Sequence, residues 1–330
     1  MEYSRILIRA TNWVGDAVMS LPALHAIRER FDQAHIAILA KPWVADLYSR
    51  ESLADEVIPY TASSLVAKWR VGRQLGSQGF DCAILLQNAF EAALLAWVAR
   101  IPDRIGYARD GRGWLLTRAV TVPKPGEIPP HQRVYYLELL RRAGIINDLP
   151  DTFPSIGRAG VHSQLMIGVS PGAAYGTAKR WLPERFAEAA VRLARERGAS
   201  IALFGSKSER ALCEQVAQLI RDVPVTNYAG QTSLAEFIDL ASRCELFLTN
   251  DSGAMHIASA LGVPTVAVFG ATDHIATGPS GANSRVVREP VECSPCLLRE
   301  CPIDHRCMTR VSATRVVEQS LELLASHSRS

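Results

Sequence analysis

The sequence predicts an α/β protein with two doubly wound parallel sheets, one in each half of the chain. Short apolar runs of strand length alternate with helical patterns. The alternation stops at a segment rich in Pro and Gly, residues 147–163, and then begins again. A length of 330 residues also corresponds to about two domains. We expect a first domain at 1–157, a second at 158–311, and a final helix within 312–330 that has room to cross back to the first domain.

In the first half, the apolar run that follows the N-terminus is the first expected strand. Similar runs recur, so the expected strands are 5–9, 35–40, 55–59 and 81–86. Helices are expected at 16–31 and 131–143, the first of them entered near Asp16. Pro22 lies inside that first helix and has no N–H to donate, so we expect the helix to kink or restart there.

The second half repeats the pattern. Strands are expected at 166–170, 200–204, 246–249 and 265–269, and helices at 184–197, 209–221, 234–241 and 312–326. Two such sheets facing one another would leave a cleft lined by the loops at the carboxyl ends of their strands. That is the usual place for ligands in folds of this class.

The second half is organised around residues 247–273, FLTNDSGAMHIASALGVPTVAVFGATD, which read as strand, turn, helix and strand. Asp251 or Ser252 can cap the helix. The turn then aims backbone N–H groups and the positive end of the helix dipole into the space above the strands, where a phosphate would be held. The alternative is a well-capped helix with no ligand.

The charge of the chain is too small to indicate nucleic-acid binding, with a net value of +3 and a pI of about 8.5. Its distribution is more informative. Residues 100–142 contain nine basic and four acidic side chains, a local excess of +5, and Lys68, Arg70 and Arg73 form a second basic cluster. The first half could present this positive surface to an anionic partner. The alternative is a set of ordinary solvated helix faces and loops.

The chain begins with a strand-like run and shows no apolar secretion segment. Its longest apolar run, 92–99, is far shorter than the roughly 20 residues that span a bilayer. We therefore expect a cytosolic protein that at most touches a membrane surface. The seven cysteines should then be mostly reduced thiols.

Four loops at strand ends carry candidate chemistry. They are TNWVGD at 11–16, SPGAAYGTAKRW at 170–181, GSKSE at 205–209 and NDSG at 250–253. Neither the G-x-G-x-x-G fingerprint of dinucleotide-binding folds nor the phosphate-binding G-x-x-x-x-G-K-[ST] loop is present. This absence counts against a standard dehydrogenase or kinase.

Four motifs in order along the chain resemble those of the ADP-heptose:lipopolysaccharide heptosyltransferases, glycosyltransferase family 9. They are N-W-V-G-D-A-V-M-S, S-P-G-A-x-x-G-x-A-K-R-W, the N-D-S-G segment through G-A-T-D, and the late C-S-P-C. The first and last resemble the heptosyltransferase II branch most. The resemblance covers nearly the whole chain and implies the GT-B architecture, two Rossmann-like domains facing a central cleft.

The resemblance also implies an activity and its partners. The enzyme would transfer L-glycero-D-manno-heptose from ADP-heptose, with inversion, to the heptosyl-Kdo inner core of lipid A-linked lipopolysaccharide. It would need no metal and no other cofactor, and no nucleic acid would be involved. It would act as a monomer in the cytoplasm of a Gram-negative bacterium, in peripheral contact with the inner membrane.

The resemblance assigns the catalytic roles to Asp16 and Lys179. Asp16 would be the base that takes the proton of the acceptor hydroxyl, and Lys179 would lie near the diphosphate. The structural alternatives are a helix N-cap for Asp16 and an exposed lysine before a helix for Lys179. Glu209 suits the ribose hydroxyls of ADP, although a surface glutamate that opens a helix is an equally ordinary explanation. Asp251 suits the sugar hydroxyls. His256 could reach the same site, although a histidine on a buried helix face is more often structural.

The full candidate sets follow from these assignments. The donor-binding set is Ser170, Gly172, Thr177, Lys179, Glu209, Asp251, Ser252, Gly253, Ala254 and His256. The acceptor-binding set is Asn12, Trp13, Lys68, Arg70, Arg73, Arg104, Arg109 and Arg112, whose cations suit a phosphorylated, acidic acceptor.

No metal site is included in these sets. The D-x-D pair with which many glycosyltransferases hold a divalent metal is absent. The late cysteines have the ligand types for zinc, but their spacing is irregular and the family resemblance carries no metal, so packed reduced thiols are the favoured interpretation. These residues are Cys293, Cys296, Cys301 and Cys307, with His305 between the last two.

Other functions fit parts of the pattern. A heptosyltransferase I, another nucleotide-sugar transferase or a nucleotide-sugar 2-epimerase would share the two-domain fold, and the epimerase would need no acceptor. A non-catalytic nucleotide-binding protein would bind ADP without consuming a donor. The presence of both Asp16 and Lys179 disfavours this last alternative.

Overall fold

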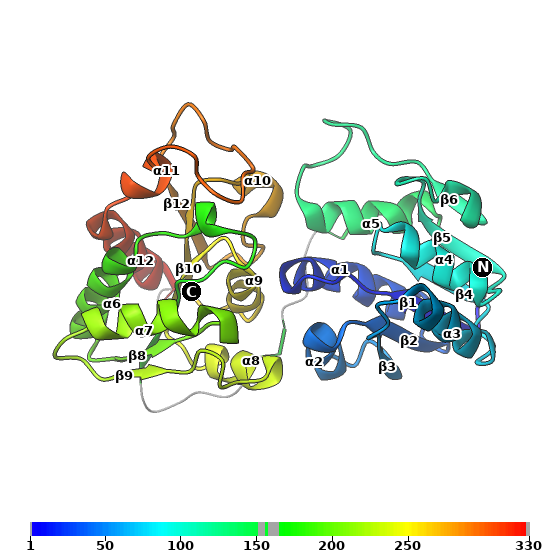
Figure 1. Ribbon diagram of the computed structural model, residues 1–330, viewed down its shortest axis with the longest axis horizontal. Coiled ribbons are helices and arrows are strands. Elements are labelled where there is room, and N and C mark those ends of the chain that lie inside the picture. Colours follow the sequence, from blue (N-terminus) through cyan, green and yellow to red (C-terminus); the bar gives the residue numbers. More distant parts are fainter. Residues whose placement is uncertain (1, 151–155, 158–164, 328–330) are drawn as a thin grey trace. The chain divides into compact units, whose positions relative to one another are not determined.

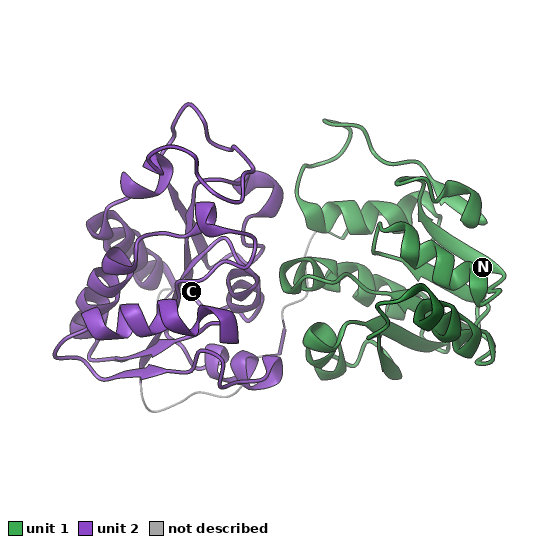
Figure 2. Cartoon of the chain, viewed as in Figure 1, with its two compact units in different colours: residues 1–154 green, residues 155–330 purple. Residues whose placement is uncertain are grey.

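The computed structural model describes residues 2–150, 156–157 and 165–327. The chain divides into two compact units, unit 1 at 1–154 and unit 2 at 155–330 (Figure 2). Each unit contains one six-stranded sheet with helices packed on it, which confirms the predicted α/β class. Of the predicted linker, 147–163, the residues 151–155 and 158–163 lie outside the described residues.

The sheet of unit 1 is parallel throughout, with strand order β3-β2-β1-β4-β5-β6. Its strands are β1 (Arg5–Arg9), β2 (His35–Ala40), β3 (Glu56–Pro59), β4 (Cys82–Leu85), β5 (Asp103–Tyr107) and β6 (Arg118–Val120). The central strands are apolar along almost their whole length because helices bury both of their faces. The order of the strands reverses between β1 and β4, so the loops after these two strands border the crevice where such sheets bind ligands.

The helices of unit 1 form one layer on each face of this sheet (Figure 1). They are α1 (Val14–Arg30), α2 (Pro42–Arg50), α3 (Leu65–Gly76), α4 (Phe90–Val98) and α5 (Gln132–Arg142), with a short 3-10 turn, η1 (Gly113–Leu115). Helix α1 packs against α2 and α5, whereas α3 packs against α4. The α3–α4 contact is close because Gly72 has no side chain: a Cβ there would lie 2.6 Å from Val98.

The sheet of unit 2 repeats this plan with strand order β12-β11-β10-β7-β8-β9, again parallel. Its strands are β7 (Met166–Ser170), β8 (Ser200–Leu203), β9 (Val225–Asn227), β10 (Leu246–Asn250), β11 (Thr265–Phe269) and β12 (Ser284–Arg288). The reversal lies between β7 and β10. The loops that follow these two strands are the predicted 170–181 and 250–253 loops, so both lie at the switch point.

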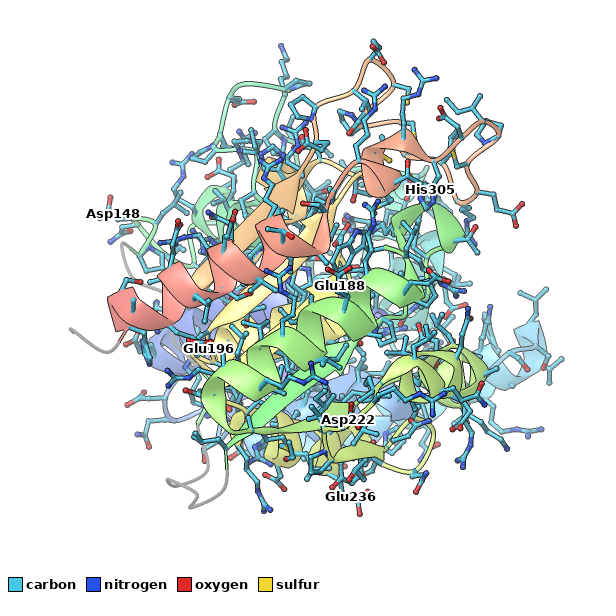
Figure 3. The ribbon with its side chains drawn as sticks, turned by 90° about the vertical axis from the view of Figure 1, so that its left-hand side faces the viewer. Asp148, Glu188, Glu196, Asp222, Glu236 and His305 are labelled. Carbon is cyan, nitrogen blue, oxygen red and sulfur yellow. The ribbon has the colours of Figure 1, made fainter. Side chains whose placement is uncertain are left out.

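The helices and 3-10 turns of unit 2 are η2 (Thr177–Lys179), α6 (Pro183–Arg197), η3 (Lys207–Glu209), α7 (Arg210–Leu219), α8 (Leu234–Ser242), α9 (Gly253–Ala260), α10 (His274–Thr277), α11 (Arg306–Thr309) and α12 (Ala313–His327). Helix α6 is amphipathic: Phe186 and Leu193 are buried in the core, and Glu188 and Glu196 point outward (Figure 3). The final helix, α12, packs on α6, β11 and β12 of its own unit. Within the described part of the chain, no helix combines the length and apolar character needed to cross a bilayer.

Several predicted elements are confirmed at their predicted bounds, namely the strands 5–9, 35–40, 166–170 and 265–269. Other predictions were wrong in detail. Helix α1, expected to begin near Asp16, begins at Val14, and it runs unbroken through Pro22, so the predicted restart is absent. Burial of nine of its side chains offsets the hydrogen bond that proline cannot donate. The predicted helix 209–221 is the turn η3 followed by α7, which ends at Leu219.

Candidate active site

The catalytic candidate in unit 1 is Asp16, in the first turn of α1 directly after β1. Trp13 occupies the N-cap position, so Asp16 is the third residue of the helix and the predicted alternative of an N-cap role is wrong. Tyr136 of α5 donates its hydroxyl hydrogen to Asp16 Oδ1 at 3.1 Å. Burial raises the pKa of Tyr136 well above its usual range, and the negative charge of Asp16 raises it further. A neutral phenol therefore orients the half-buried carboxylate.

A buried arginine holds the loop between β1 and α1. Arg9, the last residue of β1, is 1% exposed, and its guanidinium donates to the carbonyls of Ala10 at 2.6 Å and Leu39 at 3.2 Å. It also donates to Asn12 Oδ1 at 3.1 Å. Because Asn12 belongs to the predicted acceptor set, Arg9 fixes one of that set's side chains at the carboxyl end of the sheet.

Three cations lie around one carboxylate beside this loop. Glu91 forms an ion pair with Lys68 and accepts a hydrogen bond from the Tyr60 hydroxyl at 2.7 Å. Lys41 lies 4.3 Å from the centre of the Tyr60 ring. Burial lowers the pKa of Lys41, and the positive charges of Arg9 and Lys68 lower it further. Arg9, Lys41 and Lys68 against Glu91 leave two positive charges in excess, an environment that suits an anionic ligand.

The other predicted acceptor residues are spread over unit 1. Trp13 is exposed, and Arg70 and Arg73 are exposed on α3. Arg109 donates to the Tyr135 hydroxyl at 3.4 Å. These cations are accessible, but within the described residues they are not gathered into one tight cluster with Asn12 and Lys68.

Two predicted acceptor arginines are engaged with the backbone. Arg112 is fully buried and donates to the carbonyls of Gln87 and Tyr107, at the ends of β4 and β5. Burial lowers its pKa to about 10. Arg104 lies at the amino end of β5, where it donates to the carbonyls of Leu115 and Ile101. Both side chains shape loops of the unit, and Arg104 does so at the edge of the sheet opposite to Asp16.

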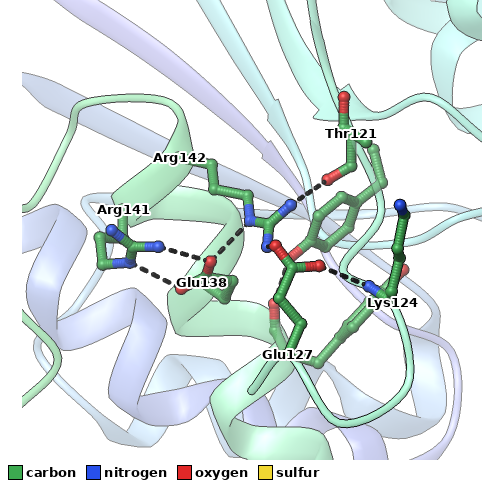
Figure 4. Close-up of polar contacts among 8 residues, drawn as sticks. Thr121, Lys124, Glu127, Glu138, Arg141 and Arg142 are labelled. Atoms are coloured by element: carbon green, nitrogen blue, oxygen red, sulfur yellow. Dashed lines mark hydrogen bonds and ion pairs between the residues drawn. The ribbon is translucent and has the colours of Figure 1, made fainter.

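A groove beside β6 is also rich in arginine. Its lining includes Arg118, Arg141 and Arg142 together with Glu127. Glu138, whose side chain is 1% exposed, accepts hydrogen bonds from Arg141 at 2.7 Å and from Arg142 at 2.6 Å, and Arg142 also pairs with Glu127 (Figure 4). Since these cations are paired within unit 1, we interpret this network as one that stabilises α5.

In unit 2, a buried asparagine fastens the 170–181 loop to the end of β10. Asn250 Oδ1 accepts a hydrogen bond from the Trp181 backbone N–H at 2.9 Å, and its Nδ2 donates to the Pro171 carbonyl at 2.7 Å. Ser170 closes β7 and is buried, and Thr177 opens the turn η2. The amide of Asn250 thus joins the two switch-point loops, and it satisfies buried backbone groups of the longer one.

The two strongest donor candidates contact each other directly. Lys179 Nζ lies 2.6 Å from Asp251 Oδ2, and the side chains are only 13% and 5% exposed. Asp251 also accepts a hydrogen bond from the Thr272 hydroxyl. Lys179 Nζ lies 4.8 Å from the centre of the Tyr175 ring. The ammonium is therefore held in one place at the switch point, so the alternative of an exposed lysine is wrong.

Helix α9 begins directly after Asp251 with Ser252 at its N-cap position. Ser252 makes no side-chain capping hydrogen bond, and its hydroxyl lies 3.2 Å from that of Thr249 instead. The N–H groups of Gly253 and Ala254 are among those that a helix cannot satisfy internally. The predicted side-chain cap is therefore absent, which leaves this end suited to a phosphate. His256 is buried on the inner side of α9.

Glu209, the last residue of the 205–209 loop, lies against Gly172 of the 170–181 loop. Its carboxylate accepts hydrogen bonds from the Ser206 backbone N–H and hydroxyl, both at 2.8 Å, which completes a capping box. A Cβ on Gly172 would overlap this carboxylate, so the glycine permits the close approach. Glu209 thus has a local structural role at a position that also borders the donor loop.

The segment that carries the late cysteines, 289–307, supports the donor loop; we refer to it as the cysteine loop. The Tyr175 hydroxyl donates to the Leu297 carbonyl at 2.7 Å, and the Ala178 N–H donates to the Arg299 carbonyl at 3.0 Å. The thiols are free, and Cys307 is buried. Among the described residues, no group of three or more His, Cys, Asp or Glu side chains is arranged to hold a metal ion.

Several residues described above, in unit 1 and in unit 2, were not predicted from the sequence. They are Arg9, Lys41, Tyr60, Glu91, Tyr136, Asn250 and Thr272. Arg9 and Asn250 carry a usable signal, since each is a polar residue that closes an otherwise apolar strand. Tyr136 carries none, because it lies 120 residues from Asp16 and inside a helix.

Known proteins resemble this chain over most of its length. A profile of glycosyltransferase family 9 (heptosyltransferase) matches residues 68–306. Lipopolysaccharide heptosyltransferase 2 of Salmonella typhimurium is 32% identical over 308 residues, 86% of this chain and 88% of that protein. Lipopolysaccharide heptosyltransferase 2 of Escherichia coli is 33% identical over 308 residues, again 86% of this chain and 88% of that protein.

A solved structure agrees with these sequence relationships. That of E. coli ADP-heptose lipopolysaccharide heptosyltransferase II matches 98% of this chain and 99% of its own chain, with a TM-score of 0.84 at 28% identity. The resemblance inferred from the sequence motifs is confirmed. The chain is a glycosyltransferase and belongs to glycosyltransferase family 9, the heptosyltransferase family.

Proposed function

We propose that this family 9 glycosyltransferase is a heptosyltransferase II, which moves heptose from ADP-heptose to the heptosyl-Kdo inner core of lipopolysaccharide. The observation that carries the proposal is the likeness, over most or nearly all of the chain, to proteins named lipopolysaccharide heptosyltransferase 2 and to the structure of heptosyltransferase II. The enzyme would work as a monomer in the cytoplasm, in peripheral contact with the inner membrane.

Asp16 is the proposed catalytic base. As the acceptor hydroxyl attacks the anomeric carbon, the carboxylate takes its proton and the bond to ADP breaks. The hydrogen bond from Tyr136 to Oδ1 helps to orient the carboxylate toward the acceptor hydroxyl. A carboxylate in the first turn of α1 also lies near the positive end of the helix dipole.

The departing ADP is the proposed ligand of unit 2. Negative charge grows on the diphosphate as the glycosidic bond breaks, and Lys179 and the N–H groups of Gly253 and Ala254 would stabilise it. Asp251 holds Lys179 through the 2.6 Å ion pair, so the cation is in position before the donor binds. Glu209 is the proposed partner of the ribose.

The acceptor is the proposed ligand of unit 1. The excess positive charge around Glu91 suits the carboxylate of Kdo, and the exposed Arg70, Arg73 and Arg109 suit acidic groups farther from the reacting hydroxyl. We propose that Arg112 contributes by shaping the loops after β4 and β5, through its hydrogen bonds to Gln87 and Tyr107.

The proposal is tested by ADP release from ADP-heptose. Wild-type protein should release ADP only when a heptosylated acceptor is present, and Asp16→Asn should lower turnover by about 10²–10⁴-fold while calorimetry shows unchanged donor affinity. Asp32→Asn is the matched control, because Asp32 is exposed just beyond the other end of α1. Full turnover in Asp16→Asn would remove the proposed base, and ADP release without acceptor would favour a different reaction.

A further inference from the structure

One surface of unit 1 exposes apolar side chains that the proposed chemistry does not use. On α3, Leu65, Val66 and Trp69 are 77%, 70% and 52% exposed. Phe90 and Trp97 of α4 and Trp114 of η1 are exposed as well. These six residues, here called the tryptophan face, lie on the solvent side of the α3, α4 and η1 layer. Large exposed apolar groups in such number indicate a binding surface.

Three aromatic rings of this face, those of Phe90, Trp97 and Trp114, contact one another. The ring of Trp114 lies 6.4 Å from the ring of Phe90 and 6.4 Å from that of Trp97. Phe90 and Trp97 are seven residues apart on α4 and therefore share one side of the helix. The opposite side of α4 carries buried residues such as Leu95. These three rings thus form a continuous set, and helix α3, which carries Trp69, packs against α4 beside them.

The charges around the tryptophan face are positive. Helix α3 contains Lys68, Arg70 and Arg73 and no acidic residue, and Arg70 and Arg73 are exposed. Glu91, the acidic residue of α4, is committed to Lys68 and the Tyr60 hydroxyl. A partner that covers this face therefore meets apolar groups and unneutralised cations together.

We propose that the tryptophan face docks on the surface of an anionic lipid bilayer. Tryptophan is favoured at the boundary between headgroups and acyl chains, where leucine, valine and phenylalanine bury apolar surface. Cations beside such residues are attracted to anionic headgroups. Arg70 and Arg73 are exposed on the same helix as Trp69, so this face pairs groups that insert into a bilayer with charge complementary to anionic headgroups.

This docking rests on the proposed function, in which the acceptor is anchored to lipid A. Lys68, a proposed acceptor contact, precedes Trp69 on α3, and Phe90 opens α4 directly after the loop that Arg112 holds. The tryptophan face therefore borders the proposed acceptor residues. Contact with the bilayer would place the acceptor site within reach of a sugar that projects from the same membrane.

Flotation with lipid vesicles tests the inference. Vesicles of phosphatidylethanolamine with about a third phosphatidylglycerol should carry the wild-type protein upward, and vesicles of phosphatidylcholine should carry much less of it. The variant Trp69→Ser/Trp97→Ser/Trp114→Ser should bind the anionic vesicles roughly 10²-fold more weakly, since each lost ring removes interfacial burial. Leu65→Glu/Val66→Glu changes only highly exposed positions and should weaken binding in the same direction.

Matched controls come from unit 2. Leu165→Ser/Leu219→Ser removes two exposed apolar groups that do not belong to the tryptophan face and should leave flotation unchanged. The triple tryptophan variant should also retain wild-type turnover on a soluble, deacylated acceptor. If the wild-type protein shows no transferase activity, the proposed function fails. Flotation still tests membrane docking in that case, because it does not depend on turnover.

Three results would overturn the docking itself. The first is vesicle binding by both face variants at the wild-type level, and the second is no binding by the wild-type protein. The third is a change in oligomeric state on sedimentation, with the wild-type protein self-associated and the triple variant monomeric. That third result would show the face to be a contact between copies of the chain.

Discussion

Removal of Lys179 separates its structural role from its proposed catalytic one. In Lys179→Met, Asp251 keeps the hydrogen bond from Thr272 but loses the cation that balances its buried charge. Breaking a buried ion pair from one side costs about 3–5 kcal/mol. Because Lys179 is 13% exposed and Thr272 remains, we expect about 2–3 kcal/mol of lost unfolding free energy in unit 2. For a unit of this size that lowers the Tm by roughly 4–12 °C.

The double variant Lys179→Met/Asp251→Asn removes both charges. Its stability should return to within about 1 kcal/mol of the wild type, because a neutral amide can still interact with Thr272. Affinity for ADP-heptose should not return. Both Lys179→Met and the double variant should bind the donor about 10–100-fold more weakly, the loss expected for one charge-assisted contact to the diphosphate.

Fluorine NMR of protein labelled with fluorotryptophan makes this measurement specific to unit 2. Of the six tryptophans, Trp181 belongs to residues 155–330 and the other five to residues 1–154. The Trp181 resonance therefore reports unfolding of unit 2 during thermal melts, and calorimetry reports donor affinity. A double variant as unstable as Lys179→Met would refute the inferred energetic coupling between Lys179 and Asp251. Wild-type donor affinity in either variant would refute the proposed role of Lys179.

Three further predictions concern other parts of the chain. Tyr136→Phe removes the hydrogen bond to Asp16, and we expect turnover to fall about tenfold with little change in donor affinity, measured by steady-state kinetics and calorimetry. Gly176→Ala would press a Cβ onto a backbone carbonyl of the cysteine loop, so unit 2 should lose about 1–3 kcal/mol in denaturant titrations, whereas Gly113→Ala in unit 1 should be nearly neutral. Hydrogen bonds from Arg141 and Arg142 lower the pKa of Glu138 in the folded protein. Unit 1 should therefore keep this stabilisation above about pH 4.3, the pKa of an unfolded glutamate, and lose it as the pH falls through the folded pKa. Melts between about pH 6 and 3 should show a shallower loss in Glu138→Gln, and equal slopes would contradict this assignment.

Local patterns predicted much of the fold. Strand β1 was predicted at its observed bounds, and β10 was predicted to end one residue before Asn250. Both strands are apolar runs bounded by loop residues, because both of their faces are buried. The strands β5 and β6 were missed, since their sequences carry charges at Asp103, Arg104 and Arg118. Asp103 and Arg118 pair with one another across the two strands, a contact that periodicity cannot show.

The site could be predicted only as far as single loops allow. The turn before α9 is visible in the sequence as polar residues at a strand end, and Lys179 is visible as the lysine that follows a loop of small residues. The contacts that orient them are not, because Lys179 and Asp251 lie 72 residues apart and meet only when β7 and β10 pair. The alternative of an N-cap role for Asp16 was wrong for a local reason: the helix starts earlier, at Val14, without a side-chain cap.

Mass spectrometry of the reaction products would identify the acceptor, on which the assignment as a heptosyltransferase II depends. Purified protein would be given ADP-heptose together with Kdo-lipid A that does or does not already carry one heptose. The proposed function predicts a mass increase of one heptose on the heptosylated acceptor and none on the other. Transfer only to the acceptor without heptose, or consumption of ADP-heptose with no change in either acceptor, would contradict it.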